Sequence, residues 1–223
     1  MTREDYQAAL DALRDGVLDL GELVVERLLQ AVEALEQADD ELAESVVEGD
    51  RTVNERYLDL ERDCIDLLAL QQPVAGDLRF VAASFKILTD LERIGDLATN
   101  LAAYARRKER DLYPDVSLRD VATIAVSMLE RALLAYEERD PDLCRAVAEQ
   151  DDEVDGLCER IGQLVVRDLI DREADSPTDV DALLPAVRRL LLAVRDVERV
   201  GDHAVNVAAR TLYMVEGDAS LLR

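Results

Sequence analysis

The chain contains one thirteen-residue segment twice: Asp90–Ala102 reads DLERIGDLATNLA, and Asp196–Ala208 reads DVERVGDHAVNVA. Most differences between the copies exchange one aliphatic residue for another; the exceptions are Leu97 to His203 and Thr99 to Val205. Both copies keep Glu, Asp and Asn at steps of four, which is the spacing of one helix face. Packing alone explains such a duplicated polar pattern poorly, so this segment is the best functional lead in the sequence.

The repeat extends over most of the chain. A shift of 101 residues aligns Asp39, Val46 and Asp50 with residues of the same or similar type in the second half, whereas the thirteen-residue segment recurs after 106 residues. The second half therefore carries five additional residues, in or near the turn at 175–179. We expect two tandem units, 1–112 and 113–223.

Hydrophobic periodicity predicts six long helices and no strand, over about 3–36, 40–72, 75–107, 117–139, 140–173 and 178–216. Proline breaks helices after 72 and near 114, and the segment 111–117 is the predicted linker. The expected N-caps are Asp39, Ser117, Asp140 and Thr178, and Pro141 is expected at a first helical position. Short turns make neighbouring helices antiparallel. The predicted fold is therefore all-α, with two tandem antiparallel three-helix bundles.

The formal net charge of −24 comes from 50 acidic and 26 basic residues, of which only Lys86 and Lys108 are lysines. Such a surface repels nucleic-acid phosphates and anionic membranes, which argues against binding to either. An acidic, lysine-poor surface is typical of a halophile-like protein in a salt-rich cytoplasm, although a GC-rich coding sequence would also favour arginine. No signal peptide or apolar span is apparent, so we expect a soluble cytoplasmic protein. The three cysteines fall within helices and share no CxxC spacing, which favours buried packing.

Oxygen-bearing side chains follow one side of each repeated helix, within a sector of about 80°. They are Glu92, Asp96 and Asn100 in the first copy and Glu198, Asp202 and Asn206 in the second. If adjacent helices fold back at Pro73 and at Ser176–Pro177, equal distances from the turns bring further acids to the same level. The facing residues are Asp50 and Asn54 in the first unit, and Asp151 and Asp155 in the second.

Clustered carboxylates on a partly apolar helix face are costly unless a cation or a proton neutralises them. Oxygen ligands suit hard or intermediate cations such as Mg²⁺, Mn²⁺ or iron, and the number of acids allows more than one ion per site. The alternative is that Arg93 and Arg199 neutralise the acids within the bundle. We expect His203 to pack at the edge of the apolar face rather than to bind metal, and Gly95 and Gly201 to allow close helix approach.

The repeated segment is similar to the signature of the PhoU family of phosphate-signalling regulators. Leu68–Arg79, LALQQPVAGDLR, also resembles that family's turn between its second and third helices. The likeness covers nearly the whole chain as two tandem units. The second half departs from it, because Ser176–Thr178 stands where the characteristic turn would be.

This resemblance implies multinuclear metal clusters held by Glu/Asp-x-x-x-Asp motifs, with iron the expected metal and manganese, zinc or magnesium as alternatives. The motifs map onto Glu92 with Asp96 and onto Glu198 with Asp202. The resemblance also implies an accessory, largely negative regulator of phosphate uptake through the ABC-type phosphate transporter, coupled in many bacteria to a sensor histidine kinase.

We therefore interpret the chain as a non-enzymatic regulator of phosphate uptake and homeostasis that docks the transporter ATPase or a kinase. A carboxylate-bridged metal enzyme, a metal store and a purely structural helical adaptor are the alternatives. The absence of a paired Glu-x-x-His pattern weighs against a di-iron oxidase. The sequence leaves open the oligomeric state, a homodimer included, and whether phosphate itself binds.

Overall fold

The computed structural model describes residues 3–71, 75–105, 117–175 and 177–222, and within these ranges it contains six helices and no strand. The helices are α1 Arg3–Gln37, α2 Asp40–Gln71, α3 Ala75–Ala105, α4 Leu118–Glu138, α5 Pro141–Asp175 and α6 Pro177–Glu216. The all-α prediction is confirmed. The linker predicted at 111–117 and the boundary between residues 112 and 113 fall almost entirely outside the described residues.

The helix starts follow the predicted capping residues in three cases. Asp39 Oδ1 accepts hydrogen bonds from the backbone N–H groups of Glu41 and Leu42, each at 3.0 Å. Asp140 Oδ1 does the same at the start of α5, and Ser117 Oγ accepts from the Asp120 N–H at 3.2 Å. These side chains satisfy backbone donors that the first helical turn leaves without partners.

The predicted cap Thr178 is wrong, because α6 already begins at Pro177 and Thr178 lies one residue inside it. Proline suits a first helical position, where its fixed φ is helical and its missing N–H costs no hydrogen bond. The same property places Pro141 at the start of α5. Here the preference of proline for this position outweighed the capping preference of threonine.

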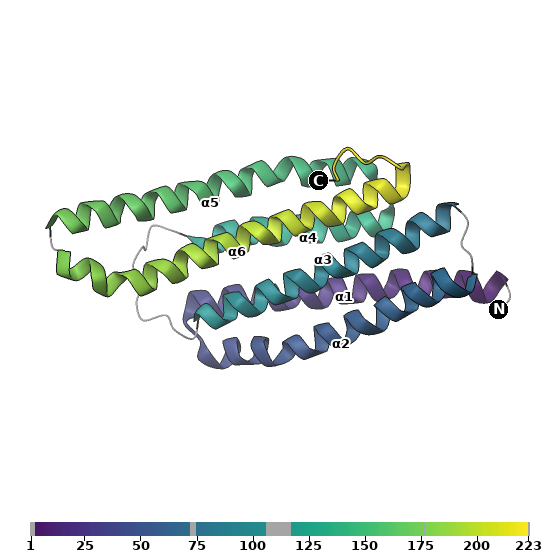
Figure 1. Cartoon of the computed structure of the whole chain (residues 1–223), viewed down its shortest axis with the longest axis horizontal. Coiled ribbons are helices and arrows are strands. Elements are labelled where there is room, and N and C mark those ends of the chain that lie inside the picture. The colour runs from purple at the N-terminus through teal and green to yellow at the C-terminus, as the bar shows by residue number, and fades with distance from the viewer. Residues whose placement is uncertain (1–2, 72–74, 106–116, 176, 223) are drawn as a thin grey trace.

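The six helices form two layers of three, as Figure 1 shows. Helices α1, α2 and α3 pack against one another in the first layer, and α4, α5 and α6 do so in the second. Helices α3 and α6, which carry the repeated segments, lie against each other between the layers, and α1 also contacts α4. The two copies of the segment are thus central in the molecule.

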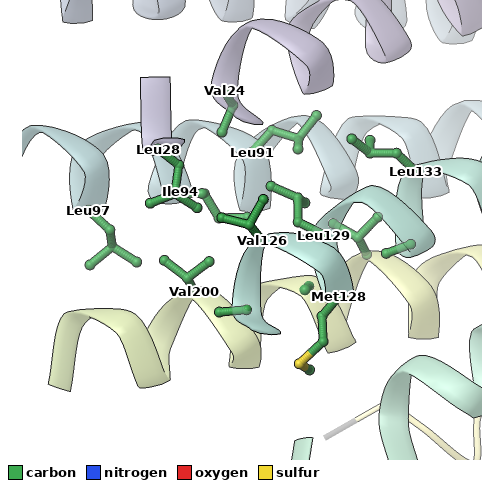
Figure 2. Packing of buried hydrophobic residues seen from close by; sticks show 14 of the residues in the cluster. Val24, Leu28, Leu91, Ile94, Leu97, Val126, Met128, Leu129, Leu133 and Val200 are labelled. Carbon is green, nitrogen blue, oxygen red and sulfur yellow. The ribbon is translucent and has the colours of Figure 1, made fainter. Parts of the chain in front are cut away.

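One hydrophobic core runs through both layers. Figure 2 shows Val24 of α1, Leu91 of α3, Leu129 of α4 and Val200 of α6 packed together, and each is at most 1% exposed. A buried polar link joins the layers within this core, since the hydroxyl oxygens of Ser84 and Tyr136 lie 2.7 Å apart. The two units therefore fold around a shared interior.

The two units differ in the length of their first helix, because α1 has 35 residues and α4 has 21. The ends of α5 and α6 nearest their connecting turn consequently project beyond α4 (Figure 1). Several large apolar side chains of this projecting hairpin are exposed, namely Leu164, Val166, Ile170 and Leu184. Within the described ranges, no helix is both long and apolar enough to cross a membrane.

Candidate functional site

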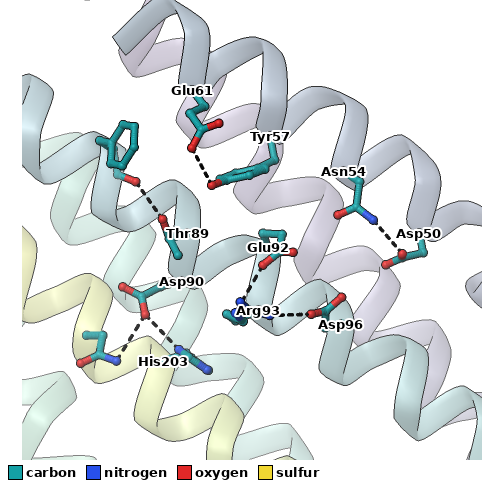
Figure 3. A network of polar contacts seen from close by, with 12 residues as sticks. Asp50, Asn54, Tyr57, Glu61, Thr89, Asp90, Glu92, Arg93, Asp96 and His203 are labelled. Atoms are coloured by element: carbon teal, nitrogen blue, oxygen red, sulfur yellow. Dashed lines mark hydrogen bonds and ion pairs between the residues drawn. The ribbon is translucent and has the colours of Figure 1, made fainter. Parts of the chain in front are cut away.

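The acids of the first repeated segment lie on α3 beside an arginine. Arg93 Nη1 is 3.2 Å from Asp96 Oδ2, and Arg93 Nε is 3.6 Å from Glu92 Oε2. Figure 3 shows Arg93 between the two carboxylates. The arginine side chain is 54% exposed and that of Glu92 only 20%, so the acid is the better shielded partner. In the first unit the acids are thus paired with Arg93, as in the alternative in which an arginine neutralises them.

The facing residues on α2 form a second polar group. Asn54 donates to Asp50 Oδ2 at 2.9 Å, and Thr99 of α3 donates across to Asp50 Oδ1 at 3.2 Å. The contact of Thr99 was not predicted from the sequence, although its position three residues after Asp96 places it near the same helix face. Its counterpart in the second unit is Val205, so this contact belongs to the first unit alone.

The carboxylates of the first unit are close enough to influence one another electrostatically. The pKa of Glu92 is raised, chiefly by burial and next by the charge of Asp96, with a further contribution from Asp50. The charge of Arg93 partly opposes this rise. The charges of Asp50 and Asp96 therefore act on Glu92, and Arg93 is the counterion beside it; that these acids form a metal site stays a prediction.

The acids of the second unit differ from those of the first in their surroundings. Asp151 of α5 is 6% exposed, and its Oδ1 lies only 3.3 Å from the position that a Cβ atom would take at Gly201. The pKa of Glu198 is raised by burial, then by the charges of Asp155 and Asp202. Arg199 lies 3.8 Å from Asp196, outside this group of acids.

Both glycines of the repeated segments allow close helix contact, as expected. A Cβ atom at Gly95 would lie 3.1 Å from Val53 Cγ1 of α2. At Gly201 the added atom would meet Asp151 as well as Val154 Cγ1 at 3.6 Å. The absence of a side chain therefore lets α2 approach α3, and α5 approach α6.

A polar junction that the sequence did not predict joins α3 to α6. Asp90 Oδ1 lies 2.9 Å from His203 Nδ1 and accepts a hydrogen bond from Asn206 at 3.3 Å, as Figure 3 shows for the histidine contact. At the other end of the crossing, Tyr104 donates to Asp196 Oδ2 at 3.0 Å. Asp90 and Asp196, the first residues of the two segments, are buried.

Two of the predicted asparagine ligands have other surroundings than the acids. Asn206 bonds to Asp90 of the other repeat, and Asn100 is exposed on α3. His203 lies at the α3–α6 boundary, where its side chain is 17% exposed. The sequence offers one indication that Asp90 and Asp196 are functional residues, because each is the first residue of its copy of the duplicated segment.

The donor chemistry of both groups fits a hard cation, since every expected ligand offers oxygen and the most shielded glutamates have raised pKa values. The side chains nevertheless do not converge. Among the residues described by the structure, no three His, Cys, Asp or Glu side chains are gathered closely enough to hold a metal ion. Metal binding in the first group would require Arg93 to give up its contact with Asp96.

The duplicated architecture is found in a known protein family. The family model described as the PhoU domain matches twice, at residues 17–105 and 118–211. The chain belongs to the PhoU family. These matches take in most of both three-helix units and both copies of the repeated segment.

Relatives in the PhoU family align along nearly the whole chain. The protein from Clostridium acetobutylicum named phosphate-specific transport system accessory protein PhoU homolog is 31% identical over 97% of this chain and 97% of its own length. The Escherichia coli accessory protein PhoU is 31% identical over 95% of this chain and 86% of its own. The crystal structure of PhoU from Pseudomonas aeruginosa superposes with a TM-score of 0.86 at 32% identity, over 96% of this chain and all of that one.

Proposed function

We propose that this PhoU-family chain is a regulator of phosphate uptake that acts negatively on the ABC-type phosphate transporter from the cytoplasmic side. The observation that supports the proposal is the full-length similarity, through both repeats, to proteins named as accessory to phosphate-specific transport. The proposed role is regulatory rather than catalytic. The partner would be the transporter ATPase, a sensor histidine kinase, or both.

Uptake of labelled phosphate in the native cell tests this role. Deleting the gene should raise uptake in phosphate-replete medium, and the wild-type chain supplied in trans should restore the lower rate. Uptake that is the same with and without the gene, in both replete and starved cells, would contradict the proposal.

The acid groups would serve this role as metal sites. In the first unit Asp50, Glu92 and Asp96 would hold the metal, with Asn54 as an additional oxygen donor; in the second unit the ligands would be Asp151, Asp155, Glu198 and Asp202. A bound cation, with iron the expected metal, would supply positive charge that cancels the repulsion among these carboxylates. The chain's own residues would thereby fix α2 against α3 and α5 against α6.

Metal analysis of the purified chain tests the sites directly. Glu92→Ala with Glu198→Ala should reduce the bound metal by more than half, whereas Glu137→Ala with Glu153→Ala, which removes two exposed acids, should leave it unchanged. Equal metal content in both double variants would show that these acids are not ligands. The uptake measurement would remain a separate test of the regulatory role.

A further inference from the structure

A cavity of about 290 Å³ opens at the end of the molecule farthest from the projecting hairpin of α5 and α6. Residues of α1, the start of α3, the end of α6 and the turn after α4 line it, so both units contribute. Phe80 in its wall precedes Glu92 by twelve residues, or about 18 Å along α3. The cavity is therefore distinct from the acid groups, and Gly76 and Asp77 of its lining belong to the turn motif that the second half lacks.

Two arginines converge on the same aromatic ring in this cavity. Arg14 Cζ lies 5.5 Å from the centroid of the Phe80 ring, and Arg139 Cζ lies 6.0 Å from it. Phe80 is 6% exposed and stacks on Tyr136 with a centroid distance of 6.2 Å. Burial raises the pKa of the Tyr136 hydroxyl, and the charges of both arginines oppose that rise, so both cations lie near one buried group.

Among the described residues these two arginines make one ion pair, and the carboxylate of Asp77 also lines the cavity. The carboxylate paired with Arg14 is that of Asp11, at 3.8 Å, and Arg14 Nε is buried without a hydrogen-bond partner. Arg139 forms no ion pair within 4 Å to any residue that the structure describes. Stacking on an aromatic ring holds each guanidinium in place but leaves its N–H donors available. Two like charges that line the same cavity, each within 6.0 Å of the same ring centroid, favour an anion bound between them.

We propose that this cavity binds a phosphate group between Arg14 and Arg139. Guanidinium groups match phosphate oxygens through paired N–H donors, and two of them can hold one tetrahedral anion. Asp77, the acidic residue of the described lining, would select among anions. A carboxylate accepts a hydrogen bond from a protonated phosphate oxygen, whereas it repels sulfate, which carries no proton at neutral pH.

The cavity has room for free phosphate or for a small phosphate monoester. Its volume is about ten times the roughly 30 Å³ that one water molecule occupies in the liquid. The apolar side chains of Leu10, Met214 and Val215 in the cavity wall would contact the organic group of such a monoester. Titration with inorganic phosphate and with glycerol phosphate distinguishes these sources: the ligand that binds more tightly identifies which one the site takes.

The test uses the purified full-length chain, with binding of inorganic phosphate measured by calorimetry at constant ionic strength. We expect saturable binding with a Kd of about 1 mM, and sulfate about tenfold weaker. Arg14→Gln with Arg139→Gln should weaken phosphate binding at least about tenfold. Arg62→Gln removes an exposed arginine of α2 that pairs with Asp59, and it should bind phosphate as the wild type does.

Asp77→Asn gives a result that a general loss of folding cannot imitate. This substitution should strengthen sulfate binding and abolish the preference for phosphate. If the double glutamine variant does not fold, Arg14→Lys with Arg139→Lys keeps both charges without the paired donors and should still weaken binding severalfold.

Binding that survives in the glutamine variant, or no saturable binding of either phosphate compound, would overturn the proposed site. So would equal affinity for sulfate and phosphate in both the wild type and the Asp77→Asn variant. These outcomes are independent of the regulatory role, because a chain without phosphate affinity could still restrain uptake in the cell.

Discussion

The surroundings of Glu198 predict that its negative charge destabilises the metal-free fold. Its folded-state pKa is raised by burial and by the charges of Asp155 and Asp202. The protonated carboxyl group of Glu198 therefore contributes favourably to the free energy of unfolding. This contribution is fully present below the unfolded pKa of about 4.3, and it is lost as the pH rises through the pKa of the folded state. Glu198→Gln should stabilise the metal-free chain at pH 7, with the difference vanishing near pH 4, in urea unfolding followed by circular dichroism.

Removing any one negative charge from a chain of net charge −24 could relieve general repulsion, so Glu153→Gln at an exposed site of α5 is the matched control. A gain of equal size in both variants would show that the surroundings of Glu198 have no special effect. If Glu198 is a ligand, saturating divalent metal should make the wild type more stable than Glu198→Gln, because the carboxamide binds a cation more weakly than the carboxylate.

The glycines of the helices differ in the room that surrounds them, and this gives a second prediction. A Cβ atom at Gly95 would lie 3.1 Å from Val53, which is 1% exposed, whereas one at Gly162 would meet nothing within 4 Å. Gly95→Val should lower the free energy of unfolding by about 1–3 kcal/mol through overpacking. Gly162→Ala should raise it by about 0.5–1 kcal/mol through helix propensity. Denaturant midpoints measure both, and stabilisation by Gly95→Val would contradict the close packing of α2 and α3.

At the residue scale, the sequence predicted contacts within a hairpin better than contacts between repeats. The helical step of four identified the shared face of Glu92 and Asp96, and the distance from Pro73 placed Asp50 near them. The bonds of Asp90 to His203 and Asn206 depend on how α3 crosses α6, and no local pattern encodes that crossing. The helical step of four therefore groups Asn206 with the acids, whereas its side chain donates a hydrogen bond to Asp90.

At the scale of the helices, local chemistry predicted most boundaries, because Asp39, Asp140 and Ser117 satisfy the first turns that follow them. The register between helices was predicted less accurately in the first unit. Val53 lies against Gly95 and Thr99 reaches Asp50, so Asp50 sits slightly beyond the level of Asp96. Simple counting from a turn ignores the geometry of the turn and the bending of long helices.

The shortness of α4 leads to a third prediction. Arg131 of α4 donates to Gln150 of α5 at 2.7 Å, and counting along both helices from this contact places the start of α4 level with about Gln163. Beyond that level α5 packs on α6 without α4, and Leu164 and Ile170 are 55% and 62% exposed. Backbone amides of 164–171 should therefore exchange hydrogen at least about tenfold faster than those of 57–64 in α2, which α1 supports.

Hydrogen exchange followed by mass spectrometry on peptides from both segments measures this difference. Equal protection would mean that something else covers the projecting hairpin in solution. Repeating the measurement over a range of protein concentrations separates self-association from intrinsic protection, because only the former becomes stronger with concentration.

At the scale of the whole molecule, the internal repeat suggests two independent domains, but the shared core predicts one cooperative unit. Leu97 of α3 and Val200 of α6 are each 1% exposed, and Ser84 meets Tyr136 between the layers. Separating the units would expose these side chains and the buried carboxylates Asp90 and Asp196 together. We therefore expect calorimetry of the full chain to show a single transition whose van't Hoff and calorimetric enthalpies agree.

The fragment 113–223 provides the decisive comparison, because it retains α4, α5 and α6 but loses the α3 surface on which α6 packs. It should lack a cooperative transition, or melt far below the full chain. In the full chain, Val200→Asp should lower the single transition without splitting it, since an unpaired charge at the α3–α6 contact destabilises both units at once. A fragment that melts at the temperature of the intact protein, or a variant with two resolved transitions, would show instead that the repeats fold separately and only associate through α3 and α6.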